Sequence, residues 1–482
     1  MAQPFVEPCS RGVIAAELCP RERGHEIPPV RRRLVLAACV LASSMAFIDG
    51  SVLTVALPRL RAALGLDLVA VQWVVNGYLL PLASLTLIGG ALADARGKSR
   101  MLMLGCLLFG AASVACALVP SAIPLIAARI VQGLGAALLI PASLALIGAT
   151  YPKAERSRAI GAWAAASALT TAAGPVLGGW LTEAFGWQAI FWINPPIAAL
   201  VVALLWAFAP ADIREPRRFD VVGAIIIALA LGALAWSLSE AGQISSRPAA
   251  SLLRSDSAVV VGVFGIAGLV SYAAWERAAA QPMTPPRLAR NRLFVGLNAG
   301  TLLIYVGLSI MFFLLPFDLL DRRGLTPTEA GLTFLPFTLG VGLLSEWFGG
   351  RADVIGARTM LFVGPCGAAA AFIWMAFGQT ASLAAGVIAP MVLLGISFAA
   401  LIAPLTASVM SSVASSDEGL ASGVNNAASR VAQLAGVAIA AGIGSLTLGY
   451  RWGLIAAAIT SLAGGLTMVL PVGLWPEKIV RR

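Results

Sequence analysis

Asp49 and Arg129 are two of the charged residues that fall within long apolar runs of the sequence. An ionisable side chain inside a membrane span costs about 2.5–3.5 kcal/mol on insertion scales, so it needs a partner or a function. Measured from the same end of the expected helices, Asp49 lies about 13 Å deep and Arg129 about 9 Å deep, at about 1.5 Å per residue. The two side chains are therefore predicted to share one layer and to pair across a helix bundle.

Such a pair could carry protons. Burial favours the protonated form of a carboxylic acid, whereas a nearby guanidinium group favours the ionised form. Opposed effects of this kind allow a carboxyl group to take up and release a proton near neutral pH, which a proton carrier requires. Protonation of Asp49 would free Arg129 and bias the bundle toward one of two states. The alternative interpretation is a static ion pair that fixes helix packing.

Other chemistry is restricted by what the chain contains. The single histidine, His25, lies in the polar N-terminal tail, so His-based catalysis and His-ligated metals are excluded from the apolar region. The cysteines show no CxxC pairing and are interpreted as small apolar side chains: Cys9, Cys19, Cys39, Cys106, Cys116 and Cys366. No phosphate-binding G-x-x-x-x-G-K-[ST] segment is present. The sequence therefore predicts no enzyme activity, no cofactor and no metal, and any energy for transport would come from an ion gradient.

The composition defines the elements that must hold these residues. Of the 482 residues, 59% are apolar and only 12% are charged, compared with roughly 25% charged in an ordinary soluble domain. The mean hydropathy is +0.88. These values exclude a disordered chain, a coiled coil and a disulfide scaffold, and they indicate a polytopic, all-α membrane protein. The net charge of +10 does not indicate nucleic-acid binding, because the basic residues cluster between apolar runs.

Fourteen apolar runs are long enough to cross a membrane, since a span needs about 20 residues. They are approximately 34–57, 70–93, 101–119, 123–149, 159–182, 189–209, 221–239, 258–275, 293–316, 330–349, 359–377, 383–410, 421–447 and 453–471. With the N-terminus inside, 24 Lys and Arg residues are cytoplasmic and 7 are external. We therefore expect a multi-pass protein of the cell (inner) membrane with both termini cytoplasmic. A full-length span follows the polar tail, so the tail is not interpreted as a removable signal peptide.

An internal repeat divides the chain. Residues 90–105 recur at 349–364 without a gap. The matched pairs include Gly90/Gly349, Ala93/Ala352, Asp94/Asp353, Gly97/Gly356, Met101/Met360, Leu102/Leu361 and Gly105/Gly364. The repeat predicts two related six-helix bundles at 34–209 and 293–471, two inserted helices with flanking loops in 210–292, and cytoplasmic tails at 1–33 and 472–482. Repeats of this kind are typical of secondary transporters, in which the substrate path lies between the halves.

Five segments, in order along the chain, resemble the fourteen-span drug:proton antiporter family of the major facilitator superfamily. They are Ile48–Pro58, Gly90–Arg100, Arg129–Ala137, Gly174–Gly179 and Trp187–Pro195. The chain departs from the family pattern at Ala95, Ser99 and Gln188. The resemblance extends over about 34–475 and implies a transporter that exchanges its cargo for protons, with Asp49 and Arg129 as the coupling residues.

The resemblance also implies roles for two glycine-containing motifs. Gly90, Asp94, Gly97 and Lys98, with Asp353 and Gly356 of the repeat, would form a gating turn and charge relay on the cytoplasmic side. A simple cytoplasmic anchor is an equal alternative for that loop. Gly174, Pro175, Gly178 and Gly179 would form the antiporter motif at the interface between the halves, where it opposes leak. Independently of any family, these residues allow a neighbouring helix to approach closely.

Cargo would be enclosed by the inner faces of both halves. Candidate lining residues are Trp73, Asn76, Tyr78, Gln132, Asn298, Tyr305 and Arg430. Aromatic side chains would suit a lipophilic or cationic guest, whereas packing or a position in the interfacial belt is the alternative for each. Arg430 forms a polar stripe with Asn425, Asn426 and Gln433, and interhelical bonding is an equal explanation for that stripe. Glu346 is expected to reach the cytoplasmic face, with cargo binding as the alternative.

These observations predict proton-driven export of amphipathic small molecules such as drugs or antibiotics. The nearest alternative is proton-coupled export of one dedicated endogenous metabolite, and a non-transporting membrane sensor is a further one. The expected partners are a small-molecule substrate, protons and the lipid bilayer, with no nucleic acid. Membrane-fusion and outer-membrane proteins could also be partners. The sequence does not indicate whether the protein is a monomer or an oligomer.

Overall fold

The computed structural model describes residues 28–210, 212, 220–241, 252–279, 286–414, 418–444 and 449–470. Within these ranges the regular structure is helical, and no strand occurs there. Twelve stretches of the described chain are long and apolar enough to cross a membrane. This agrees with the prediction of an all-α, multi-span membrane protein. His25 and the outer parts of both predicted tails, 1–27 and 471–482, lie outside the described residues.

The N-terminal half consists of six long helical segments. They are α2 (Pro29–Leu64), α3 (Leu68–Arg96), α4 (Lys98–Leu118), α5 (Ala122–Thr150), α6 (Lys153–Phe185), and the pair α7 (Ala189–Trp192) and α8 (Asn194–Phe208). Local residue types explain several boundaries. Gly65 ends α2 with a φ of 62°, and Asp67 begins α3 by accepting a hydrogen bond from the Ala70 backbone N–H at 2.7 Å. Helix α2 packs on α5, α6 and α8, and α5 packs on α3 and α4.

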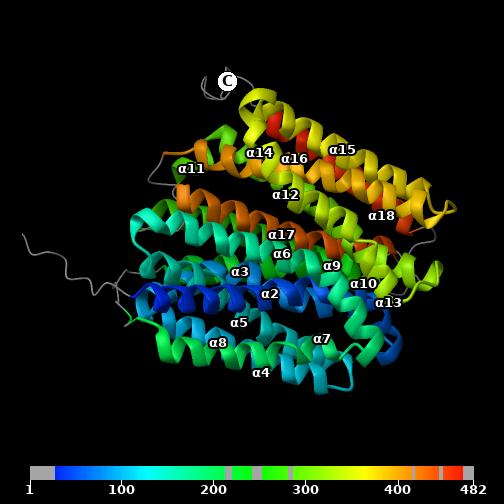
Figure 1. Ribbon diagram of the computed structural model, residues 1–482. Helices are drawn as coiled ribbons and strands as arrows, with labels where there is room; N and C mark the ends of the chain where they lie inside the picture. The colour runs from blue at the N-terminus through cyan, green and yellow to red at the C-terminus, as the bar shows by residue number, and fades with distance from the viewer. Residues whose placement is uncertain are drawn as a thin grey trace, which may run out of the picture.

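The C-terminal half repeats this arrangement (Figure 1). After the short α11 (Pro286–Arg290) come α12 (Arg292–Phe317), the π-helical turn η4 (Asp318–Arg322), α13 (Pro327–Leu332), α14 (Leu335–Ile355), α15 (Ala357–Phe377), η5 (Ala384–Ile388), α16 (Ala389–Ser411), α17 (Glu418–Gly444) and α18 (Gly449–Val469). Helix α12 packs on α17 and α18, and α16 packs on α14 and α15. Thr326 and Glu329 form a capping box that begins α13.

Two further helices lie between the halves in sequence, α9 (Val221–Ala241) and α10 (Leu252–Ala278). They pack on each other, and Trp275 Nε1 donates to Asp220 Oδ2 at 2.8 Å. Helix α9 also packs on α3 of the first half and α17 of the second. One inserted helix therefore contacts both halves.

The backbone reproduces the sequence repeat. Gly97 has φ 113° and ψ 128°, and Gly356 has φ 90° and ψ 122°. The N–H of Gly97 donates to the Ala93 carbonyl at 3.1 Å, and the N–H of Gly356 donates to the Ala352 carbonyl at 3.0 Å. A positive φ is readily adopted only by glycine. The repeated glycines therefore make the same tight turn between consecutive helices in each half.

The two ends of the bundle differ in how the halves meet. We call the end at which α2 begins the tail end and the opposite one the far end. At the far end, Arg61 pairs with Asp321 at 3.7 Å, and Glu183 Oε2 accepts from the Thr328 backbone N–H at 3.0 Å. Both contacts join the two halves. At the tail end, the contacts Arg32–Glu155 (3.0 Å) and Asn291 Nδ2–Ser412 O (2.6 Å) each stay within one half.

Candidate functional site

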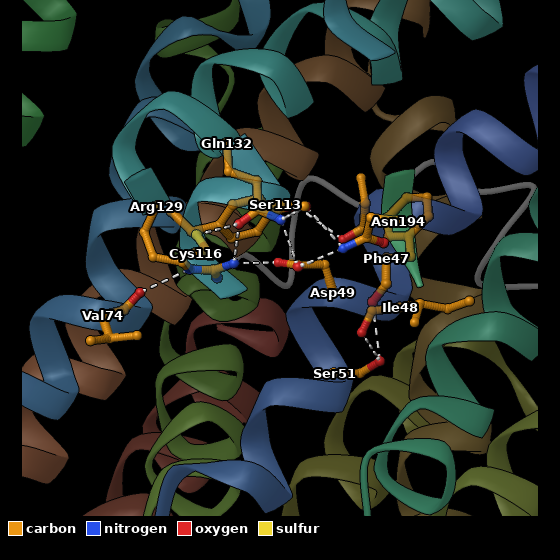
Figure 2. Close-up of polar contacts among 12 residues, drawn as sticks. Phe47, Ile48, Asp49, Ser51, Val74, Ser113, Cys116, Arg129, Gln132 and Asn194 are labelled. Atoms are coloured by element: carbon orange, nitrogen blue, oxygen red, sulfur yellow. Dashed lines mark hydrogen bonds and ion pairs between the residues drawn. The ribbon is translucent and has the colours of Figure 1, made fainter. Parts of the chain in front are cut away.

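A buried polar cluster surrounds Asp49 at the middle of α2 (Figure 2). The Arg129 guanidinium of α5 donates from NH1 to Asp49 Oδ2 at 2.5 Å. Gln132, one turn later on α5, donates from Nε2 to Asp49 Oδ1 at 2.7 Å. Asn194 at the start of α8 donates from Nδ2 to the same oxygen at 3.3 Å. All three partners are donors, so the arrangement complements a carboxylate.

Arg129 is held on several sides. Its Nε donates to the Val74 carbonyl of α3 at 3.1 Å, and its NH1 also donates to Gln132 Oε1 at 2.6 Å. The guanidinium carbon lies 4.5 Å from the centroid of the Tyr78 ring, a distance typical of a cation–π contact. The Tyr78 hydroxyl donates to the Ala46 carbonyl at 3.0 Å. The ion pair therefore ties α2, α3 and α5 together.

The cluster is almost sealed from solvent. Asp49 is 3% exposed and Arg129 is 1% exposed. Two charges at such depth are tolerated only when each is paired and hydrogen-bonded. A proton added to Asp49 would place an O–H where donors already converge. One of those donors would then lose its acceptor, and the Arg129 contact would weaken.

Two members of the cluster did not emerge from the sequence. Ser113 of α4 accepts from Gln132 Nε2 at 2.7 Å and from Asn194 Nδ2 at 3.1 Å. Asn194 and Ser113 are both fully buried. Asn194 lies in the segment 187–195 that resembles the family, so the sequence did contain a reason to select it. Ser113 carries no signal, because a serine in an apolar helix is common.

A cavity of about 270 Å³ lies between the two halves, beside the cluster. Its walls come from α2, α3, α5 and α6 of the first half and from α12, α14 and α17 of the second. Most lining side chains are apolar. Arg129 contributes to the wall, and Gly50 and Ser51, which follow Asp49 in α2, do so as well. The ion pair therefore lies directly behind the cavity surface.

The expected lining residues divide into three groups. Tyr78, Tyr305 and Arg430 line the cavity. Gln132 belongs to the buried cluster instead. Trp73, Asn76 and Asn298 are not among the lining residues.

Helix neighbours explain why the last group lies elsewhere. Leu80 approaches Gly232 of α9, and Asn76 and Trp73 lie one and two turns earlier on that face of α3. Asn298 accepts from Asn425 Nδ2 at 3.2 Å, so it joins α12 to α17. In all three cases the side chain faces a neighbouring helix or lies between two helices.

The loop that contains Gly90, Asp94, Gly97 and Lys98 makes its contacts within the first half. Lys98 and Asp94 lie 3.7 Å apart, four residues from each other. Asp212, which follows α8, accepts from the backbone N–H of Ser99 at 2.9 Å and of Arg100 at 3.3 Å. A Cβ on Gly97 would lie 2.3 Å from the Asp212 carboxylate. Gly97 therefore supplies both the turn and the room for this cap, whereas Gly90 has Pro141 as its neighbour.

The motif residues Gly174, Pro175, Gly178 and Gly179 of α6 contact two different neighbouring helices. A Cβ on Gly174 or Gly178 would collide with Ser51 or Val52 of α2, inside the same half. A Cβ on Gly179 would lie 2.2 Å from the Pro327 carbonyl oxygen of α13, in the other half. Pro175 likewise presents its carbonyl to Gly331 of α13. Only part of the motif therefore lies at the interface between the halves.

The described residues form no metal site, and no acid is among those that line the cavity. Glu346 of α14 is exposed and does not line the cavity. Across the described ranges, no three His, Cys, Asp or Glu side chains gather where they could hold a metal ion. The chemistry of the described site is thus that of a buried carboxylate, a guanidinium group and amides beside an apolar cavity.

Comparison with known proteins places this geometry in context. The family model described as Major Facilitator Superfamily matches residues 39–296 and 297–478. The multidrug resistance protein Stp of Mycobacterium tuberculosis is 33% identical over 408 residues, which are 84% of this chain and 74% of Stp. The methylenomycin A resistance protein of Streptomyces coelicolor is 33% identical over 452 residues, 92% of this chain and 93% of that protein.

Solved structures share the fold at low sequence identity. A crystal structure of a point mutant of the peptide transporter POT in complex with sulfate aligns with a TM-score of 0.69 and 15% identity. The alignment covers 92% of this chain and 95% of that one. At this identity the likeness concerns the fold alone.

Proposed function

The chain belongs to the major facilitator superfamily, and we propose that it is a secondary active transporter that exports amphipathic small molecules in exchange for protons. The observation that carries this proposal is the Asp49–Arg129 pair, buried directly behind a largely apolar cavity between the two halves. The relatives named for multidrug and methylenomycin A resistance support drug or antibiotic cargo. The protein acts by moving a solute, not by enzyme catalysis.

Asp49 is the proton carrier in this proposal, and Arg129 senses its charge. In the ionised state, Asp49 accepts from Arg129, Gln132 and Asn194. Protonation removes the charge that Arg129 faces and releases the guanidinium toward the cavity that it already lines. Cargo in the cavity and a proton on Asp49 would thus compete through Arg129, and such a coupling is reciprocal by thermodynamic necessity.

The halves 34–209 and 293–471 are the moving bodies, and the state described here is closed at the far end. Helices α6 and α13 meet there with their backbones in contact. The loop around Asp94, Gly97 and Lys98 and its repeat around Asp353 and Gly356 lie at the opposite end. They are proposed to gate that end, as the antiporter motif gates the far one.

The full topology in this proposal has fourteen spans in the cell membrane with both termini cytoplasmic. Helices α6 and α9 add two spans to the twelve apolar stretches of the described chain. They contain 33 and 21 residues, which at about 1.5 Å per residue reach the roughly 30 Å of a bilayer core. The tail end is then the cytoplasmic end, because the start of α2 and the turns from α3 to α4 and from α5 to α6 carry clustered Lys and Arg residues.

Everted membrane vesicles with an inside-acid pH gradient test this function. Cationic, neutral and anionic amphipathic dyes are added while dye uptake and dissipation of the gradient are recorded together. We expect both signals with the wild type and neither with Asp49→Asn, which removes the charge but keeps the side-chain shape. Glu155→Gln is the matched control, because Glu155 is an exposed acid paired with Arg32 within the first half, away from the cavity.

Each outcome is informative. Equal dye uptake and gradient loss in Asp49→Asn and the wild type would place proton coupling at another residue. Absence of flux for every dye in wild-type vesicles that contain folded protein would contradict export itself. Loss of activity in Glu155→Gln as well as Asp49→Asn would mean that the assay reports stability instead of coupling.

A further inference from the structure

The cavity wall carries an excess of positive charge. Among the described lining residues the only charged side chains are Arg129 and Arg430, and none is an acid. Asp49 neutralises Arg129 from behind. Arg430 of α17 therefore contributes a net positive charge to an otherwise largely apolar cavity between the halves.

Arg430 has few partners of its own. Its NH1 donates to Gln433 Oε1 on the same helix at 3.3 Å. Its guanidinium carbon lies 5.6 Å from the centroid of the Phe47 ring on α2. No carboxylate pairs with it within the ranges that the structure describes. A guanidinium group has five N–H donors, so most of them remain available on the cavity side.

The buried Arg129 and the partly buried Arg323 show what a structural role requires. Arg129 donates to a carboxylate, an amide and a backbone carbonyl. Arg323 pairs with Asp318 and donates to the carbonyls of three residues near the start of η5. Each is satisfied by groups from more than one element. Among the described residues, Arg430 has one hydrogen-bond partner, Gln433, three residues away on its own helix, so packing does not account for its charge.

We propose that Arg430 is the anion-binding residue of the cavity and that the cargo includes amphipathic organic anions, with a carboxylate or phenolate on Arg430. A carboxylate matches the planar fork of a guanidinium group and can accept two parallel N–H bonds from it. The apolar part of the cargo packs against the cavity aromatics, among them Phe312 and Phe337. This inference rests on the proposed export function and specifies its substrate class.

Calorimetric titration of the purified full-length protein with three matched probes tests the proposal. The probes are 2-naphthylacetate, 2-(2-naphthyl)ethanol and 2-(2-naphthyl)ethyltrimethylammonium, which share one ring system and differ in charge. We expect the wild type to bind the anion at least about tenfold more tightly than the alcohol, because the charge-assisted bonds act only on the anion. The cation should bind most weakly of the three.

Three variants assign the preference to one residue. Arg430→Gln should bind anion and alcohol within about twofold of each other, whereas Arg430→Lys should keep part of the preference because the charge remains. Arg451→Gln is the control: Arg451 also lies over a phenylalanine ring, that of Phe377 at 4.2 Å, but is not a lining residue. It should match the wild type. Thermal unfolding of each variant identifies any that fail to fold.

The proposal is overturned if the wild type binds all three probes equally, or if folded Arg430→Gln keeps the full anion preference. Dye flux in the everted vesicles separates this failure from failure of the export function. Proton-coupled flux of neutral dyes without an anion preference would leave export standing and remove the anion site. Anion binding that depends on Arg430, without flux of any dye, would keep the site and contradict export.

Discussion

Gly179 of α6 and Gly331 of α13 lie reciprocally against each other's helix. A Cβ on Gly179 would lie 2.2 Å from the Pro327 carbonyl oxygen, and a Cβ on Gly331 would lie 2.3 Å from the Pro175 carbonyl oxygen. The two halves therefore meet at the far end through backbone atoms. Only glycine permits that approach at either position.

Gly179→Ala should hold the far end apart. The added methyl group meets backbone, which cannot move aside as a flexible side chain could. Overpacking of this kind costs about 1–3 kcal/mol, which lowers the ratio of far-end-closed to far-end-open molecules by roughly 5- to 150-fold. A cysteine at the cavity residue Thr54 (Thr54→Cys) should then react with a membrane-impermeant maleimide added from the far side. Gly331→Ala should have the same effect.

The control is Gly148→Ala, because a Cβ at Gly148 of α5 would meet nothing within 4 Å. It should leave the labelling pattern of the Thr54→Cys protein unchanged. Labelling of the Gly179→Ala protein from the tail side alone would show that backbone contact at this point does not control closure.

Asn194→Leu should move the pH profile of transport to higher pH. The Asn194 amide donates to Asp49 at 3.3 Å, and its own Oδ1 is buried without a partner. Leucine keeps the approximate size but removes a donor that favours the ionised carboxylate. A hydrogen bond to a charged group is worth about 1.5–3 kcal/mol, so its loss should be measurable in the pH profile.

Transport rates measured at several pH values check this expectation, and Asn298→Leu is the matched control substitution. Asn298 joins α12 to α17 and has no contact with the Asp49 cluster. A purely structural effect would lower the rate at every pH without moving the profile. That outcome in Asn194→Leu would remove Asn194 from the proton step.

Gly97→Ala should lower the stability of the tail end, and the second substitution Asp212→Ala should partly restore it. The backbone at Gly97, with φ 113°, is strained for alanine, at a cost of about 1–3 kcal/mol. The new Cβ would also collide with the Asp212 carboxylate. In the Gly97→Ala background, Asp212→Ala removes that collision, whereas alone it removes a helix cap worth about 0.5–2 kcal/mol.

The measurement is the midpoint of thermal unfolding of the purified variants. Gly65→Ala separates strain from collision, because Gly65 also has a positive φ but open space around it. Its midpoint should fall less than that of Gly97→Ala. Purely additive effects of Gly97→Ala and Asp212→Ala would show that the two residues do not interact.

Fourteen spans can be distinguished from twelve by labelling. A cysteine at Ser246, between α9 and α10, should react with an impermeant reagent from outside the cell if α9 and α10 both cross the membrane. Ser121→Cys at the far end and Arg100→Cys at the tail end are the two reference positions. If Ser246→Cys, like Arg100→Cys, reacts only after the cells have been opened, then α9 and α10 form a hairpin that does not cross the membrane.

The sequence located the Asp49–Arg129 layer because depth along a spanning helix can be counted from its end. It did not locate Ser113 or the role of Asn194, since those depend on which helices are neighbours. Lining residues were equally hard to select. Helix α3 is apolar on all sides, so its pattern does not show which face turns to the cavity. Tyr78 faces the cavity, whereas Trp73 and Asn76 belong to the face turned toward α9.

The position of α9 has a mechanical consequence. Because α9 rests on α3 of one half and α17 of the other, any rotation of the halves that preserves both contacts must have its axis close to α9. Displacements grow with distance from such an axis. The widest excursions of the transport cycle then fall where the halves meet without α9, as α6 does with α13 and α14. The inserted helices α9 and α10 thus give the molecule, which is built from two repeated halves, one side that acts as a hinge and another side that opens.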